Sequence, residues 1–137
     1  MSGITELDEL LRSMRPKLIE GEFVFCTVSG HIADYVELAP LAPLALFRES
    51  EGLTLVLDKS VAESAGLSFE GVYRQITLTV HSSLEAVGLT AAVAKQLASQ
   101  GISTNVIAAY YHDHIFVPAN KASAALSALE AFHSDEC

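Results

Sequence analysis

The stretch from Ser82 to Leu89 has the composition of a turn that leads into a helix, and such a turn could bind a carboxylate. A helix start exposes several backbone N–H groups and carries about half a positive charge from the helix dipole, so it attracts anions. Gly88 lacks a Cβ and would let a ligand approach the backbone closely. The alternative role of this glycine is to relieve packing between the helix and a strand.

A free amino acid also carries an ammonium group, and two acidic residues could bind it. Asp113 is the first candidate because we expect it at the end of the second strand of its unit, and Glu85 is the second. Each also has a simpler role. Asp favours turns, where it bonds its own backbone, and a carboxylate in a first helical turn is stabilised by the dipole.

The pair Tyr110-Tyr111 could stack against the side chain of a ligand. Neighbouring residues of a strand point to opposite faces, so only one of these rings can face a given pocket. Packing in the core is the more common role of either ring. Asn105 and Ser82 could donate or accept hydrogen bonds, although a polar residue that faces solvent needs no such purpose.

The run His112-Asp113-His114 raises the question of a metal site, because residues two apart on a strand share a face and His is a common zinc ligand. Two imidazoles are too few for a firm site, and nothing in the spacing requires His81 as a third ligand. Exposed turn histidines are the ordinary explanation, so no metal or other cofactor is expected.

No catalytic residue is expected either. The sequence lacks a GxSxG elbow, a glycine-rich phosphate loop and an HExxH motif. Cys26 lies within an apolar run rather than beside an activating base, which favours a buried structural thiol. A small enzyme or a metal-binding protein with a dispersed site remains the alternative, as does a pure oligomerisation module.

These residues must be positioned by elements that the hydrophobic pattern predicts. In the first half, apolar spacing predicts a helix over Ile4–Met14, and continuous apolar residues predict a strand at Glu22–Val28. A hairpin is expected between Leu44–Arg48 and Leu53–Leu57 because Gly52 precedes the second run. A short helix follows over Asp58–Ala65, capped by Asp58 or Ser60.

The second half of the chain has a clearer pattern of polar and apolar residues. Polar and apolar residues alternate over Gln75–His81, which predicts a half-buried strand, and Leu84–Ser99 predicts a helix that ends before Gly101. Two strands are expected at Ile102–Tyr111 and Ile115–Val117, with His112-Asp113-His114 at the reversal between them. A last helix covers Ala122–Phe132.

From residue 73 onward this order is that of a ferredoxin-like βαββαβ unit without its final strand. The missing strand would come from Glu22–Val28 or from a partner chain. The first half repeats part of the order as strand, strand, helix. We therefore predict an α+β fold of two interleaved ferredoxin-like units, divided as residues 1–68 and 69–137.

Composition and charge narrow the class of protein. The chain has 137 residues, of which 50% are hydrophobic and 18% charged, so it can build a core. Its net charge of −9 makes nucleic acid an unfavourable partner. No apolar run is long enough to span a membrane and the start of the chain does not read as a signal peptide, so no membrane partner and a cytoplasmic location are expected.

The residues from Ser82 to Leu89, the following helix, and the turn Gly101-Ile102-Ser103 before the next strand resemble an ACT domain of the aspartokinase type. The whole chain is similar to small stand-alone bacterial proteins built from tandem ACT units, and to the ACT modules of the cytosolic arginine sensors of animals. ACT domains bind small ligands, usually amino acids, at interfaces between paired units.

The resemblance implies a regulatory protein that binds a small molecule, an amino acid, between its units and pairs as a homodimer. It implies a ligand between the loop 82–89 and the second strand. The candidate ligand-binding residues are Ser82, Ser83, Glu85, Val87, Gly88, Leu89, Asn105, Tyr110 and Asp113.

Overall fold

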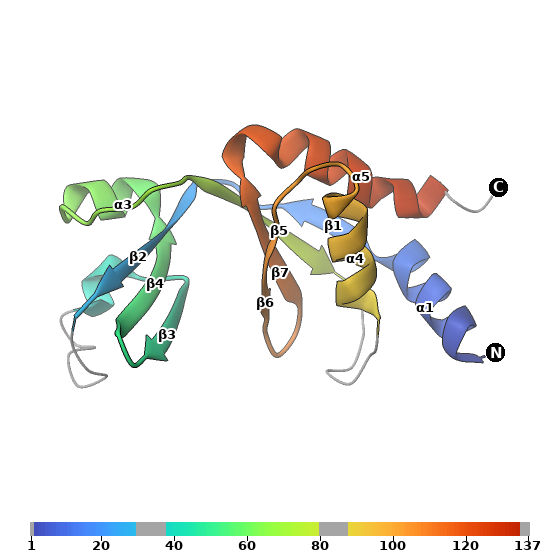
Figure 1. Ribbon diagram of the computed structural model, residues 1–137, viewed down its shortest axis with the longest axis horizontal. Helices are drawn as coiled ribbons and strands as arrows, with labels where there is room; N and C mark the ends of the chain where they lie inside the picture. The colour runs from blue at the N-terminus through green and yellow to red at the C-terminus, as the bar shows by residue number, and fades with distance from the viewer. Residues whose placement is uncertain (1, 30–37, 80–87, 135–137) are drawn as a thin grey trace. The chain divides into compact units, whose positions relative to one another are not determined.

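The computed structural model describes residues 2–29, 38–79 and 88–134 (Figure 1). Its contacts group the described chain into a middle unit, residues 21–73, and a split unit, residues 1–20 together with 74–137. The packing thus joins the beginning of the chain to its second half. The expected division into residues 1–68 and 69–137 concerns modules along the sequence, and it stays a prediction.

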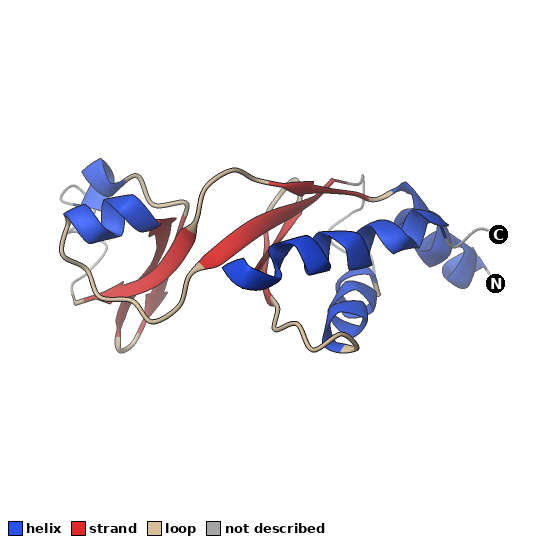
Figure 2. Ribbon diagram, turned by 90° about the horizontal axis from the view of Figure 1, so that it is seen from above, coloured by secondary structure: helices blue, strands red, loops and turns tan. Residues whose placement is uncertain are grey.

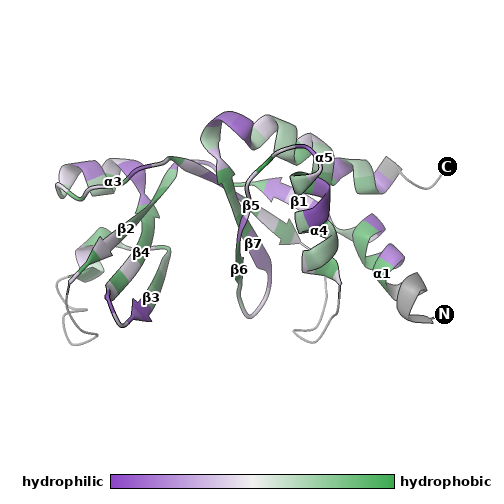
Figure 3. Cartoon of the chain, viewed as in Figure 1, coloured by the Kyte–Doolittle hydropathy of each residue, from purple (hydrophilic) through white to green (hydrophobic). Residues whose placement is uncertain are grey.

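The middle unit is built on three antiparallel strands in the order β3-β4-β2. Its elements are β2 (Phe23–Val28), the short 3-10 helix η2 (Ala39–Leu41), β3 (Ala45–Glu49), β4 (Gly52–Asp58) and α3 (Lys59–Ser64). The predicted strand, hairpin and short helix are therefore confirmed. In Figure 3 hydrophobic residues run along β4, whereas the end of β3 is hydrophilic.

Two local features explain the hairpin and the helix of the middle unit. Gly52 has a φ of +151°, and a Cβ there would lie 2.9 Å from the carbonyl oxygen of Val28, so only glycine fits. Asp58 caps α3, because its carboxylate accepts from the backbone N–H of Ser60 at 2.9 Å and from its hydroxyl at 2.6 Å. These hydrogen bonds hold the pKa of Asp58 below its ordinary value.

The split unit has a four-stranded sheet in the order β1-β5-β7-β6. Its elements are α1 (Ser2–Ser13), β1 (Arg15–Leu18), β5 (Tyr73–Thr79, beginning in the middle unit), α4 (Leu89–Ala98), β6 (Asn105–Ala108), β7 (Asp113–Pro118), η3 (Ala119–Lys121) and α5 (Ala122–Ser134). This is the strand order of a ferredoxin-like unit whose final strand is supplied by β1.

The final strand of the split unit comes from a different segment than the expected Glu22–Val28 or a partner chain. Arg15–Leu18 pairs antiparallel with β5, from Arg15 opposite Thr79 to Leu18 opposite Ile76. The predicted donor, Glu22–Val28, forms the central strand of the middle unit instead. Because α1 ends at Ser13 and the chain turns at once into β1, the split unit completes its own sheet.

Helices α4 and α5 lie on one face of this sheet (Figure 2). The core between them is formed by buried residues of both layers, and α1 contributes to it through Leu11. The main buried side chains are Met14, Ile76, Leu78, Leu89, Val93, Leu97, Ile115, Val117, Ala125 and Leu129. None of the helices that the structure describes is long and apolar enough to cross a membrane.

Strand β5 differs from the half-buried strand that its alternation predicts. Ile76 and Leu78 are buried toward the helices, but Gln75 and Thr77, on the opposite face, are only 5% and 6% exposed. Both faces of the strand are therefore buried, and its polar residues need hydrogen-bond partners within the protein.

Candidate functional site

The predicted anion site lies where α4 begins. Gly88 is the N-cap of α4, with a φ of +100°, and it has no side chain of its own to cap the helix. A Cβ on Gly88 would lie 3.2 Å from Cδ2 of Leu7, so α1 covers this residue on one side. Leu89 is 2% exposed and belongs to the core, so its side chain takes no part in a site.

Part of the predicted site cannot be placed. Ser82, Ser83, Glu85 and Val87 lie outside the described residues, as does His81. What the structure shows of the loop is its end, where α4 starts with a backbone conformation that favours glycine. The contact with Leu7 supports packing relief as one role of Gly88.

The hairpin of β6 and β7 carries three more of the predicted residues. Asn105 opens β6 opposite Phe116 and is exposed, while Asp113 opens β7 opposite Ala108 and is half-buried. The reversal lies before Asp113, where the N–H of Ala109 donates to the carbonyl of His112 at 3.1 Å. Asp113 therefore begins a strand, and the expectation that it ends the preceding one is wrong.

Tyr110 and Tyr111 both lie in this turn rather than on a strand. They are 78% and 79% exposed, and their rings meet edge to face with centroids 5.0 Å apart. Neither ring packs in the core. Figure 1 shows this turn and the beginning of α4 at the same end of the split unit, so the structure brings Tyr110 and Asp113 to the end where the ligand was predicted.

A buried polar cluster lies on the sheet face opposite the helices, and sequence reasoning missed it. Nδ1 of His114 lies 3.1 Å from Nε2 of Gln75 and 3.0 Å from Oγ1 of Thr77, and the Gln75 amide also donates to Thr77 at 3.3 Å. Because the amide nitrogen of Gln75 can only donate, Nδ1 of His114 accepts and the ring proton is on Nε2.

Two physical causes lower the pKa of His114. Burial, and next the neighbouring His112, lower the pKa of His114, while Asp113 acts in the opposite direction. The rings of His112 and His114 are 6.5 Å apart, and Nδ1 of His112 is buried without a hydrogen-bond partner among the described residues. The interpretation of these histidines as exposed turn residues is therefore only partly right: His112 closes the turn, but neither side chain is fully exposed, and His114 lies on β7.

The described residues contain no group of three or more His, Cys, Asp or Glu side chains that could hold a metal ion. Cys26 is a free thiol in the core of the middle unit, and burial raises its pKa. A raised pKa leaves the thiol protonated and poorly nucleophilic at neutral pH.

Models of the ACT domain match residues 2–74 and, separately, residues 70–131 of the chain. The chain belongs to the ACT domain family. The two matches together with the strand orders confirm the predicted architecture of tandem, interleaved ferredoxin-like units. Tandem ACT domains are regulatory, ligand-binding modules, and this role is the one the chain's two matches support.

Solved structures agree with this assignment. A Vibrio cholerae protein described as of unknown function and a possible transport protein is 57% identical, with 96% of this chain and 98% of that one covered and a TM-score of 0.86. The ligand-free regulatory subunit of aspartate kinase from Thermus thermophilus is 13% identical, with coverage of 85% and 94% and a TM-score of 0.65.

Aspartokinase III of Escherichia coli, in complex with aspartate and ADP, is 16% identical, with 92% of this chain but 34% of that one covered and a TM-score of 0.62. At these low identities the two kinase structures show a shared fold. No curated protein matches the chain significantly.

Proposed function

We propose that the protein is a cytoplasmic sensor that binds a free amino acid and changes its association as a result. The observation that carries this proposal is the beginning of α4, whose N-cap is Gly88, a residue with no side chain to cap the helix, in a chain made of two ACT domains. The first N–H groups of a helix are satisfied by side chains, water or a ligand, and an α-carboxylate is a suitable acceptor for them.

Asp113 is the proposed partner of the ligand's ammonium group. It opens β7 next to the turn that holds Tyr110, and it is half-buried, so it can remain in contact with both ligand and solvent. Leu7 closes one side of Gly88, so a ligand approaches the helix start from the side away from α1. Tyr110 is exposed and available to contact the rest of the ligand. Asn105 is also exposed, but it pairs with Phe116, three residue pairs farther from the turn than Asp113, so it lies away from this end of the hairpin.

The ligand would lie between paired ACT units, with a second copy of the chain completing the site as a homodimer. A ligand that binds the dimer more tightly than the monomer shifts the equilibrium between them toward the dimer, to an extent set by the difference in the two affinities. The target that such a shift would regulate is another protein or a reaction step sensitive to the same amino acid.

A thermal-shift screen of the twenty amino acids tests this function. A ligand that binds only the folded protein stabilises it by about 2.7 kcal/mol at a hundredfold excess over its dissociation constant, so at least one amino acid should raise the melting temperature clearly. Twenty unchanged melting temperatures at millimolar ligand would count against the proposal.

Asp113→Asn is the informative variant, and Asp8→Asn is its matched control because Asp8 is an exposed carboxylate on α1. We expect the first to weaken the response about tenfold through the lost charge on the ammonium group and the second to leave it unchanged. Gly88→Val is a poor probe of binding, because the new side chain would also collide with Leu7. Equal responses of the two Asn variants would remove Asp113 from the site.

A further inference from the structure

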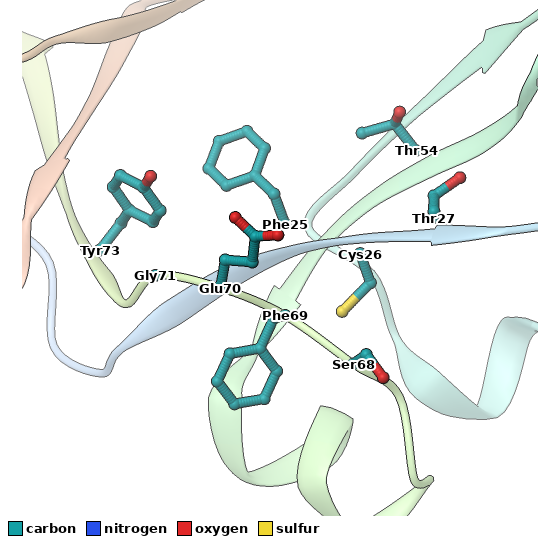
Figure 4. A pocket seen from close by; sticks show the side chains of 9 residues that line it. All are labelled: Phe25, Cys26, Thr27, Thr54, Ser68, Phe69, Glu70, Gly71 and Tyr73. Carbon is teal, nitrogen blue, oxygen red and sulfur yellow. The ribbon is translucent and has the colours of Figure 1, made fainter.

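The middle unit contains a cleft of about 480 Å³ whose lining includes none of the residues proposed to bind the amino acid. It lies where β2 and the segment 68–71 separate (Figure 4). This volume is within the range of pockets that hold small organic molecules. Its lining is mainly aromatic and hydroxyl-bearing, and consists of Phe25, Cys26, Thr27, Thr54, Ser68, Phe69, Glu70, Gly71 and Tyr73.

The cleft exists because strand pairing stops early. Among the described residues, β2 pairs with β5 only through Phe23 and Tyr73. Beyond that pair the ring of Tyr73 folds back over Gly71, where an added Cβ would lie 3.2 Å from both the hydroxyl oxygen and Cε1 of the ring. Glycine at this position therefore permits the ring position that forms one wall of the cleft.

Aromatic rings and one carboxylate face the same side of this gap. Phe25 and Tyr73 meet edge to face, with centroids 5.3 Å apart and planes at 73°. Figure 4 shows Phe25, Tyr73 and Glu70 projecting to the side on which Thr27 and Thr54 also project, while Phe69 points to the other side. A ligand on the first side would meet ring surfaces and the Glu70 carboxylate together.

The charge of the cleft selects the ligand. Glu70 is the only charged residue among those that line it, and the hydroxyl of Thr54 donates to a second carboxylate, that of Glu49. No lysine or arginine lines the cleft, and Lys59 lies 3.7 Å from the carboxylate of Glu22. A cation is attracted by such a carboxylate and by ring faces, whereas an anion finds no positively charged side chain among the lining residues.

We propose that this cleft binds a small organic cation with a hydrophobic body, such as a primary amine. Its ammonium group lies against Glu70 and the aromatic rings, and its apolar part packs on Phe25. This binding site is separate from the proposed amino-acid site, because all its residues belong to the middle unit and all the described residues of the other site belong to the split unit.

The test compares three probes of one shape and different charge: phenethylammonium, 2-phenylethanol and phenylacetate. Titration of the full-length protein, followed by amide chemical shifts, gives the affinity and the location of each. We expect the amine to bind about fivefold more tightly than the alcohol, from the ion pair and the cation–π contact, and phenylacetate to bind most weakly. The affected amides should be those of residues 25–27 and 68–73.

Glu70→Gln should abolish the preference for the amine over the alcohol, whereas Glu63→Gln, an exposed carboxylate of α3 outside the cleft, should preserve it. Both positions are on the surface, so both variants are expected to fold. Equal affinities of the amine and the alcohol for the unmodified protein would overturn the proposal. So would shifts located in the split unit, or a loss of preference that is the same in both variants.

Discussion

Thr77 provides a quantitative test of the buried polar cluster. Its hydroxyl lies 3.0 Å from Nδ1 of His114 and accepts from the Gln75 amide at 3.3 Å, and the residue is 6% exposed. Thr77→Val keeps the branched shape of the side chain but removes both hydrogen bonds. The amide of Gln75 keeps its bond to His114 at 3.1 Å, so no buried acceptor is left without a donor.

The expected loss follows from these contacts. A buried hydrogen bond contributes about 0.5–1.5 kcal/mol net, and burying a methyl group in place of a hydroxyl offsets part of the loss of two bonds. We therefore expect Thr77→Val to lower the free energy of unfolding by about 1 kcal/mol. For a chain of this size, that corresponds to about 3–5 °C in melting temperature.

Chemical denaturation of Thr77→Val and of a control, Thr90→Val, measures this difference. Thr90 is exposed on α4, and Thr and Val have similar helix propensities, so the control should change the free energy of unfolding by less than about 0.5 kcal/mol. Nitrogen chemical shifts of His114 report whether the proton is on Nε2. Equal stabilities of the two variants, or a proton on Nδ1, would refute the cluster as described.

Two further predictions concern pH and the beginning of α4. The pKa of His114 is lowered by folding, so the unfolded chain takes up the proton first. Stability therefore falls as pH decreases from about 6.5, the ordinary value, toward the lower folded-state pKa. Melting curves at pH 7.5 and 5.5 should show a fall that His114→Gln reduces, and an equal fall in the unmodified protein and in His114→Gln would contradict this. Gly88→Ala should lower the free energy of unfolding by about 1–2 kcal/mol more than Gly66→Ala does in denaturation experiments. Both residues have a positive φ, but only at Gly88 would the new Cβ contact Leu7. Equal losses at the two glycines, or an undiminished loss for Gly88→Ala in a Leu7→Ala background, would show that the contact with Leu7 contributes nothing.

Elements with strong periodicity were predictable from the sequence. The spacing of apolar residues located α1, α5 and the hairpin of β3 and β4, and the side-chain chemistry of Asp58 located the start of α3. In each case the local pattern and the tertiary packing require the same conformation. Agreement between local and global preference is typical of natural sequences.

Strand β1 was missed because its local signals oppose its conformation. It has four residues, Pro16 among them, and two of the four are charged. Pro16 lies opposite Leu78, and within the described parts of the chain β1 pairs with β5 alone, so it is an edge strand, where a proline is tolerated. Its conformation is fixed by a partner strand far along the sequence, and such a pairing leaves no trace in local periodicity.

The polar cluster was missed for a related reason. Alternation of Gln75 and Thr77 with apolar neighbours predicts a face toward solvent, and only the arrival of His114 on β7 makes that face a satisfied, buried network. The same limit applies to the aromatic cleft, whose residues come from β2, β4 and the segment 68–73. A spacing rule cannot join residues that only the fold brings together.

The binding function is tested most directly by the amide spectrum of the full-length protein recorded with and without a mixture of the twenty amino acids. If an amino acid is held at the helix start, the signals of residues 88–90 and of Asp113 should shift most, and the shifts should be much smaller in Asp113→Asn. Superimposable spectra at millimolar concentrations, or shifts confined to positions away from α4 and β7, would contradict the account.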